Sequence, residues 1–229
     1  YFMDWTYLVF VLPAVLFSLW AQARVKSTFA RYSQIPARMT GAEAAELVLR
    51  MDQVNGVAVE PIAGQLTDNY DPRDGRIRLS RGVYDAATVS AVGVAAHEAG
   101  HAAQYAAGYG PVKLRMAVIP ACQFGSTLSW PLLILGMVLG SQRLCWAGIL
   151  LFGLVVLFQL ITLPVEFNAS DRALAALSDS GCFDEATLEG AGKVLRAAAL
   201  TYVAALAVSM GQLLRLLLIF GGGSDRRRR

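Results

Sequence analysis

The sequence predicts a mainly α-helical membrane protein with three to four transmembrane helices and a small α+β domain. Of its 229 residues, 55% are hydrophobic and only 16% are charged, whereas an average soluble domain carries about 25% charged residues. The mean hydropathy is positive, at +0.47. Charges are missing from several long runs and frequent between them. These observations exclude a disordered chain and an ordinary soluble domain.

Charge and cysteine content exclude further classes. The tail at residues 224–229 holds four Arg and one Asp, and so accounts for the whole net charge of +3. No other basic block exists, so nucleic acid is not an expected partner. Cys122, Cys145 and Cys182 are widely spaced and form no metal-binding or disulfide pattern. The first two lie in apolar runs, where we expect buried thiols.

The first transmembrane helix is expected in residues 1–23. Residues 5–23 carry no charge, and these 19 residues are enough to cross a bilayer. Trp5, Tyr7 and Trp20 lie near the ends of this run, as in an aromatic belt. A cleaved signal peptide is the alternative, but its basic residues would precede the apolar run, and here they follow it.

Residues 24–115 have an ordinary polar composition and are expected to form the α+β region. A capping residue and a high alanine content predict its helices, alternation of apolar and polar residues predicts its strands, and turn-forming residues predict its turn. In chain order they are a helix at 40–53 that begins at Thr40, a strand at 57–62, a turn at 71–75, a strand at 76–80 and a helix from Asp85 to about Ala107.

Residues 116–163 are expected to form a transmembrane helical hairpin. Arg143 is the single charge between positions 116 and 165, a stretch too long for one span and long enough for two. The sequence Gly-Ser-Gln-Arg at 140–143 supplies the turn. A hairpin buried in a large soluble core is the alternative, which fits a chain of this size poorly.

The remaining residues divide into two segments. Residues 164–196 form a connecting segment with a helix, and Pro164 is expected to kink or restart that helix. Residues 197–229 form the last apolar helix and the basic tail. Arg215 lies near the end of the apolar run and can extend to the interface. This run either crosses the bilayer or lies at its surface.

Basic residues predict the orientation. Four Lys or Arg between positions 24 and 38 follow the first span before any acidic residue, which is typical of the cytoplasmic side. Residues 24–115 are then cytoplasmic, and the hairpin returns residues 164–196 to the same side. If the last run spans, the tail Arg226–Arg229 lies outside, against the same rule, so the side of the tail stays open.

The helix that begins near Asp85 carries His97-Glu98-Ala99-Gly100-His101. Residues four apart lie on one helix face, so both imidazoles can bind one Zn²⁺ ion. Glu98 can then reach a water molecule on the metal, which is the H-E-x-x-H arrangement of zinc peptidases. The alternatives are two histidines on a polar face or a structural zinc site, but no cysteine is near in the sequence.

Glu166 is the expected third ligand. A catalytic zinc ion takes three protein ligands and keeps one open position. Since the chain has only two histidines, the third ligand should be a carboxylate. Glu166 stands in a neighbourhood almost without charge, where an unpaired carboxylate is costly. An acidic residue at a helix N-terminus is the alternative.

Several segments of the chain resemble the neutral zinc metallopeptidase family of bacterial membrane proteins, and together they extend over nearly the whole chain. The resemblance is carried by residues 94–102 and 162–170, and also by residues 18–22, 66–72 and 198–204. It implies a multi-pass membrane peptidase of the gluzincin type, with a zincin-like domain. His97, His101 and Glu166 would be its zinc ligands and Glu98 its catalytic residue. More distantly, the chain is similar to the membrane gluzincins that include the heat-shock protease HtpX.

One position departs from the gluzincin pattern. Ser170 stands where many gluzincins have an Asp that hydrogen-bonds a ligand histidine. We therefore expect this role to be absent at position 170, with Asp171 or Asn168 as substitutes.

The expected mechanism is hydrolysis by a zinc-activated water with Glu98 as general base. Tyr202, Arg172 and Tyr105 are candidate donors to the oxyanion. By resemblance, the strand at 76–80 is expected to pair with extended substrate.

The sequence thus predicts a membrane zinc endopeptidase with one Zn²⁺ per chain. It would be a multi-pass protein of the cell membrane, with its active site on the cytoplasmic side and a peptide or protein as substrate. The alternative is a noncatalytic zinc-bound membrane scaffold or adaptor. The oligomeric state and the identity of the substrate are not predicted.

Overall fold

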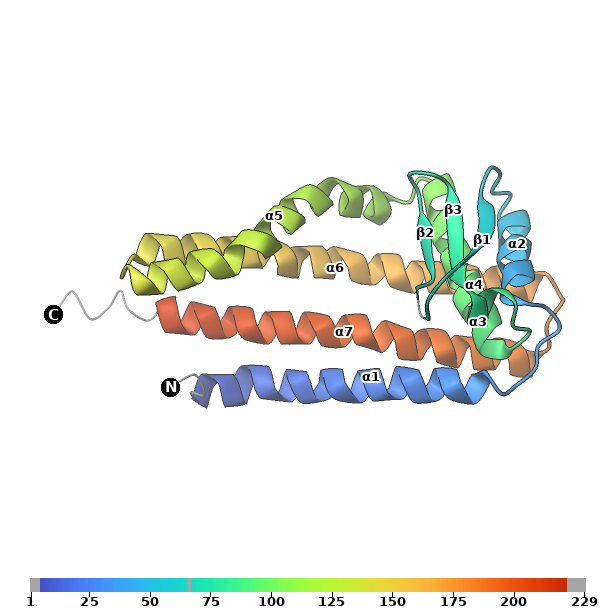
Figure 1. The fold of residues 1–229 in the computed structure, drawn as a ribbon, viewed down its shortest axis with the longest axis horizontal. Coiled ribbons are helices and arrows are strands. Elements are labelled where there is room, and N and C mark those ends of the chain that lie inside the picture. Colours follow the sequence, from blue (N-terminus) through green and yellow to red (C-terminus); the bar gives the residue numbers. More distant parts are fainter. Residues whose placement is uncertain (1–4, 66, 222–229) are drawn as a thin grey trace. The chain divides into compact units, whose positions relative to one another are not determined.

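The computed structural model describes residues 5–65 and 67–221 and confirms the mainly helical fold class (Figure 1). Leu66 and the basic tail lie outside the described residues. The elements, in chain order, are η1 (Tyr7–Val11), α1 (Leu12–Tyr32), α2 (Gly41–Met51), β1 (Ala58–Ile62), β2 (Asn69–Asp71), β3 (Arg76–Ser80), α3 (Arg81–Tyr84), α4 (Val89–Ala106), α5 (Gly110–Val138), α6 (Gln142–Asp179) and α7 (Glu185–Gly221).

The chain divides into two compact units. Of the described residues, unit 1 comprises 5–21, 113–163 and 201–221, and unit 2 comprises 22–65, 67–112 and 164–200. Four of the helices of the described chain, α1, α5, α6 and α7, contribute residues to both units.

Unit 1 is built from apolar helical segments. Four helices of the described chain are long and apolar enough to cross a bilayer: Tyr7–Tyr32, Gly110–Val138, Gln142–Asp179 and Glu185–Gly221. The last of these includes the apolar run that begins at residue 197, for which the sequence alone allows either a crossing of the bilayer or a position at its surface. Many large apolar side chains of these helices are exposed, as expected of surfaces that face lipid.

A short turn joins α5 and α6, and these helices extend beyond the residues 116–163 expected for a transmembrane hairpin. Helix α5 ends at Val138 and α6 begins at Gln142. Gly140 lies between them with a φ of +62°, a left-handed conformation that glycine adopts without strain. Cys122 and Cys145 are buried and unbonded, as the sequence predicts.

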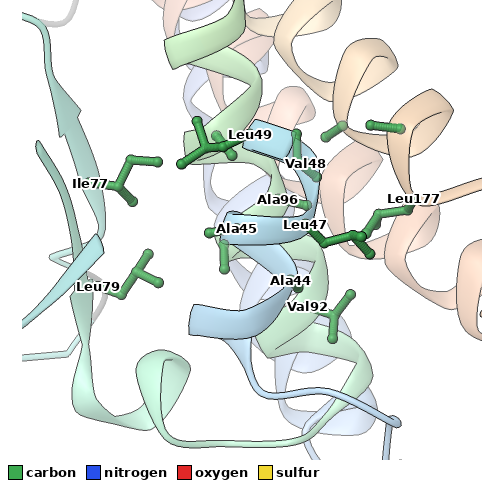
Figure 2. Packing of buried hydrophobic residues seen from close by; sticks show 14 of the residues in the cluster. Ala44, Ala45, Leu47, Val48, Leu49, Ile77, Leu79, Val92, Ala96 and Leu177 are labelled. Carbon is green, nitrogen blue, oxygen red and sulfur yellow. The ribbon is translucent and has the colours of Figure 1, made fainter. Parts of the chain in front are cut away.

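Unit 2 contains a small sheet packed on helices. The strand order is β1-β3-β2, with β1 parallel and β2 antiparallel to the central strand β3. Ile77 and Leu79 of β3 are fully buried and face the alanine-rich helices α2 and α4 (Figure 2). Leu177 of α6 belongs to the same core (Figure 2). This packing supports α4, the helix that carries the histidine pair.

Several local expectations are confirmed and others need correction. Thr40 caps α2 through a capping box with Glu43. The helix expected from Asp85 begins only at Val89, after the cap Thr88, and a separate short helix, α3, precedes it. Strand β2 was not expected from the sequence. It is only three residues long, too short to show a clear alternation.

Pro164 does not restart a helix. Helix α6 runs continuously from Gln142 to Asp179 with Pro164 inside it. Proline is tolerated within membrane helices where other groups compensate for the lost hydrogen bond.

Candidate metal centre

Helix α4 places both histidines on one face. Its N-terminus is fixed by Thr88, whose side chain accepts a hydrogen bond from the backbone N–H of Ala91. The rings of His97 and His101 lie side by side, with centroids 4.7 Å apart and planes inclined by 77°. The four-residue spacing therefore produces the paired imidazoles that it predicts.

Close packing of α6 on α4 brings a carboxylate to this pair. A Cβ atom on Gly100 would overlap the carbonyl oxygen of Ala169, so glycine is required at this approach. Glu166, one turn before Ala169, points its Oε2 atom at both rings. The distances are 3.3 Å to Nε2 of His97 and 3.4 Å to Nε2 of His101.

These three side chains have the spacing that a zinc ion needs. Donors placed tetrahedrally at about 2.0–2.1 Å from one zinc ion lie about 3.3–3.4 Å from one another. Both distances between Glu166 and the histidines match this donor–donor distance. One donor atom from each of the three residues lies within 4.8 Å of the others. Two imidazoles and a carboxylate are also the ligand types of catalytic zinc sites. The residues present therefore fit the metal that the sequence implies.

The burial of Glu166 excludes the alternative explanation for this residue. It is only 3% exposed and lies deep inside α6 rather than at a helix N-terminus. A buried carboxylate must be paired or metal-bound, and the two histidines are its observed partners. The helix dipole at an N-terminus cannot account for its position.

Glu98 and His101 have shifted acidities. Burial raises the pKa of Glu98 above its usual range, and the carboxylates of Glu166 and Asp68 act in the same direction, while His97 and His101 oppose the shift. Burial is the largest single effect on His101 and opposes its charged form, but the hydrogen bond to Glu166, the charges of Glu98 and Glu166 and the hydrogen bond to Gln104 together raise its pKa. A carboxyl with a raised pKa is better matched to accepting and returning a proton near neutral pH.

The expectation for position 170 is wrong. Ser170 Oγ lies 3.1 Å from Nδ1 of His97, so the serine contacts the ligand histidine at the position where many gluzincins have an Asp. Position 170 follows Glu166 by one helical turn and shares its face. A hydroxyl can donate or accept, so it can occupy this place without a carboxylate. Asp171 is exposed, and Asn168 contacts other groups.

Gln104 is a residue of this site that the sequence reasoning missed. It is fully buried, and its Oε1 atom lies 3.0 Å from Nδ1 of His101. It stands three residues after His101 on the same helix, and a polar residue there among alanines was the available signal.

The other candidates have varied surroundings. Arg172 donates to Asn168, and the ring of Tyr105 packs edge-on against Tyr70 of β2, with centroids 5.5 Å apart. Tyr202 belongs to unit 1, whereas the candidate ligands belong to unit 2. No contact of these residues tests an oxyanion role, which stays a prediction.

Strand β3 is not available for substrate pairing as expected, because β1 and β2 occupy its two sides. The edges of the sheet are β1 and β2. Of these, β2 is in contact with α4, and its Tyr70 packs against Tyr105 of that helix.

Comparison with known proteins identifies the family of the chain. Residues 7–221 match the family model described as "Putative neutral zinc metallopeptidase". The chain is 47% identical over 222 residues to the "Putative membrane protease YugP" of Bacillus subtilis (strain 168), with 96% of this chain and 98% of that protein covered. No solved structure matches the chain. From its match over nearly its whole length, the chain belongs to the neutral zinc metallopeptidase family of membrane proteins.

Proposed function

We propose that this protein is a membrane-bound zinc endopeptidase that hydrolyses peptide bonds with Glu98 as general base. The observation that carries the proposal is the convergence of His97, His101 and Glu166 from two helices, with spacing suited to one Zn²⁺ ion. Family membership supports a peptidase. The relative in Bacillus subtilis is described as a membrane protease.

Each residue has a role that its chemistry allows. His97, His101 and Glu166 would hold the ion, which when bound supplies Lewis-acid polarisation of the scissile carbonyl and acidification of a water molecule. Glu98, adjacent to the first ligand, accepts the proton of the attacking water. Glu98 then returns this proton to the nitrogen of the leaving amine. Its raised pKa in this buried setting makes the Glu98 carboxylate a stronger base, which favours the first step.

Extended substrate would add to an edge of the sheet. Among β1 and β2, the strand in contact with α4 is β2, and Tyr70 of β2 packs on Tyr105 of α4. We therefore assign β2 as the strand beside which a peptide is held, since an exposed edge offers unpaired backbone groups.

The active site would face the cytoplasm. Support comes from the basic residues that follow the first span, and from the hairpin that returns residues 164–196 to the same side of the membrane as residues 24–115.

Glu98→Gln tests the catalytic role. The amide cannot accept the proton of water, so we expect peptide cleavage to fall by about 100- to 10,000-fold, while zinc content stays at that of the wild-type protein. Cleavage of a fluorogenic peptide library and elemental analysis of the purified protein measure the two effects.

Glu46→Gln is the matched control, because Glu46 is exposed on α2 and should leave both readings unchanged. If Glu98→Gln cleaves at the wild-type rate, Glu98 is not the base. If the wild-type protein binds zinc and cleaves no peptide, the noncatalytic scaffold becomes the better description.

A further inference from the structure

A chain of hydrogen bonds extends from Nδ1 of His101 through Gln104 and Asn168 to Arg172, all within unit 2. Gln104 is fully buried, and its Nε2 atom donates to the carbonyl oxygen of Val165 at 2.7 Å and to Oδ1 of Asn168 at 3.0 Å. Its Oε1 atom faces Nδ1 of His101 at 3.0 Å. A buried amide with all of these bonds formed holds one fixed orientation.

The chemistry of the groups in this chain of hydrogen bonds determines which atoms donate. The Nε atom of Arg172 can only donate, so the atom of Asn168 that it contacts at 3.0 Å must be the carbonyl oxygen. The carbonyl of Val165 can only accept, so the atom of Gln104 that faces it must be the amide nitrogen. The oxygen of Gln104 is therefore the atom that faces His101.

This assignment fixes the tautomer of His101. An amide oxygen only accepts, so Nδ1 of His101 must carry the proton. In the neutral ring, Nε2 then holds the free lone pair, and it is the atom that lies 3.4 Å from Glu166. A metal ligand needs this lone pair.

The two histidines differ in how they are held. The Ser170 hydroxyl beside Nδ1 of His97 can rotate and either donate or accept, so it imposes no tautomer by itself. The outer end of the chain behind His101 is anchored instead by a permanent cation, Arg172. This guanidinium also lies near Asp52, where burial raises the pKa of the carboxyl and Arg172 opposes that shift.

We propose that Gln104 is a positioning residue that locks His101 with its proton on Nδ1 and its Nε2 lone pair towards the zinc site, and that Asn168 and Arg172 hold Gln104 in place. The proposal rests on the proposed zinc site of His97, His101 and Glu166. Gln104 acts through His101 and touches no substrate.

Gln104→Met tests the proposal directly, because Met has a similar size and offers no strong acceptor. We expect the dissociation constant for zinc, measured by chelator competition on the purified protein, to rise by about 10- to 100-fold. Gln104→Glu keeps an oxygen towards His101 but loses the amide hydrogens that reach Val165 and Asn168, so it should recover only part of the affinity that Gln104→Met loses.

Histidine-selective ¹⁵N labelling supplies a spectroscopic reading, since the chain has only two histidines. In the zinc-loaded wild-type protein, we expect the Nδ1–H proton of His101 to be protected from exchange with water. This signal should be lost in Gln104→Met while the signals of His97 remain. Ser170→Ala should affect His97 instead.

Two further variants separate positioning from stability. Val92→Ala opens a cavity in the same helix, where Val92 is fully buried, and should lower the melting temperature without changing zinc affinity. Arg172→Met removes the outer anchor and should weaken zinc binding in the same direction as Gln104→Met, by about threefold to tenfold. It therefore tests the proposal if Gln104→Met does not fold.

The proposal is overturned if Gln104→Met and Arg172→Met leave zinc affinity and the Nδ1–H signal of His101 unchanged, or if Val92→Ala weakens zinc binding equally. If the wild-type protein binds zinc without shifting either imidazole, the proposed zinc site itself fails. The two failures are thus distinguishable.

Discussion

At the scale of single residues, Glu166 is the ligand whose removal is most informative. It is the only one of the three candidate ligands that comes from α6, and its Oε2 atom faces both histidines. Removing a residue that only hydrogen-bonds to a metal ligand weakens metal binding by about 10- to 100-fold. We expect Glu166→Ala, which removes a ligand itself, to weaken zinc binding by more than this. Elemental analysis and chelator competition measure the change.

Asp171→Ala is the matched control for Glu166→Ala. Asp171 is a carboxylate on the same helix but is exposed, so its removal should leave zinc binding as in the wild-type protein. Equal zinc content in Glu166→Ala and the wild-type protein would show that Glu166 is not the third ligand.

The residues of the site differ in how far the sequence predicts them. His97, Glu98 and His101 follow from local helical spacing, and Glu166 follows from the scarcity of histidine and of charge around it. The roles of Ser170 and Gln104 depend on how α4 and α6 are rotated against each other. That rotation is set by tertiary packing, which no local pattern in the sequence encodes.

At the scale of elements, the approach of α6 to α4 depends on Gly100. Alanine there would gain up to about 1 kcal/mol of helix propensity, but its Cβ would overlap the carbonyl of Ala169, and such overpacking costs about 1–3 kcal/mol. The clash outweighs the gain. We therefore expect Gly100→Ala to displace Glu166 from the histidines, lower zinc affinity and lower the melting temperature.

Gly153→Ala provides the comparison on α6. A Cβ at Gly153 would meet no neighbouring atom, so the substitution should be neutral or slightly stabilising, with zinc affinity unchanged. If both glycine variants behave alike, the close approach at Gly100 does not position the site.

The elements themselves were predictable where they are long or well capped. Thr40 and the apolar runs identify their helices. The three-residue strand β2 and the central position of β3 were not predictable, because strand order arises from pairing between distant segments. The uninterrupted helix across Pro164 shows the same limit, since the environment of a proline decides whether a helix continues.

At the scale of the whole molecule, the ligands can meet only if the membrane is crossed twice between His101 and Glu166. The structure offers three positions for thiol labelling: the native Cys182, which is partly exposed between α6 and α7, an exposed site at Asn55, and the hairpin turn at Ser141. We expect Asn55→Cys and Cys182 to react alike with a membrane-impermeant maleimide, and Ser141→Cys to react from the opposite side.

Each cysteine is tested alone, with Cys122 and Cys145 replaced by alanine. In intact cells, Ser141→Cys should be labelled, and the other two should be labelled only after permeabilisation. Labelling of Asn55→Cys and Cys182 from opposite sides would contradict the two crossings. A reversed but consistent pattern would correct only the cytoplasmic orientation.

X-ray absorption at the zinc edge of the purified, zinc-loaded protein tests the central claim most directly. The account predicts one ion per chain, bound by two imidazole rings and by oxygen at about 2.0–2.1 Å, with no sulfur. A sulfur shell near about 2.3 Å, or a spectrum with fewer than two imidazoles, would contradict it.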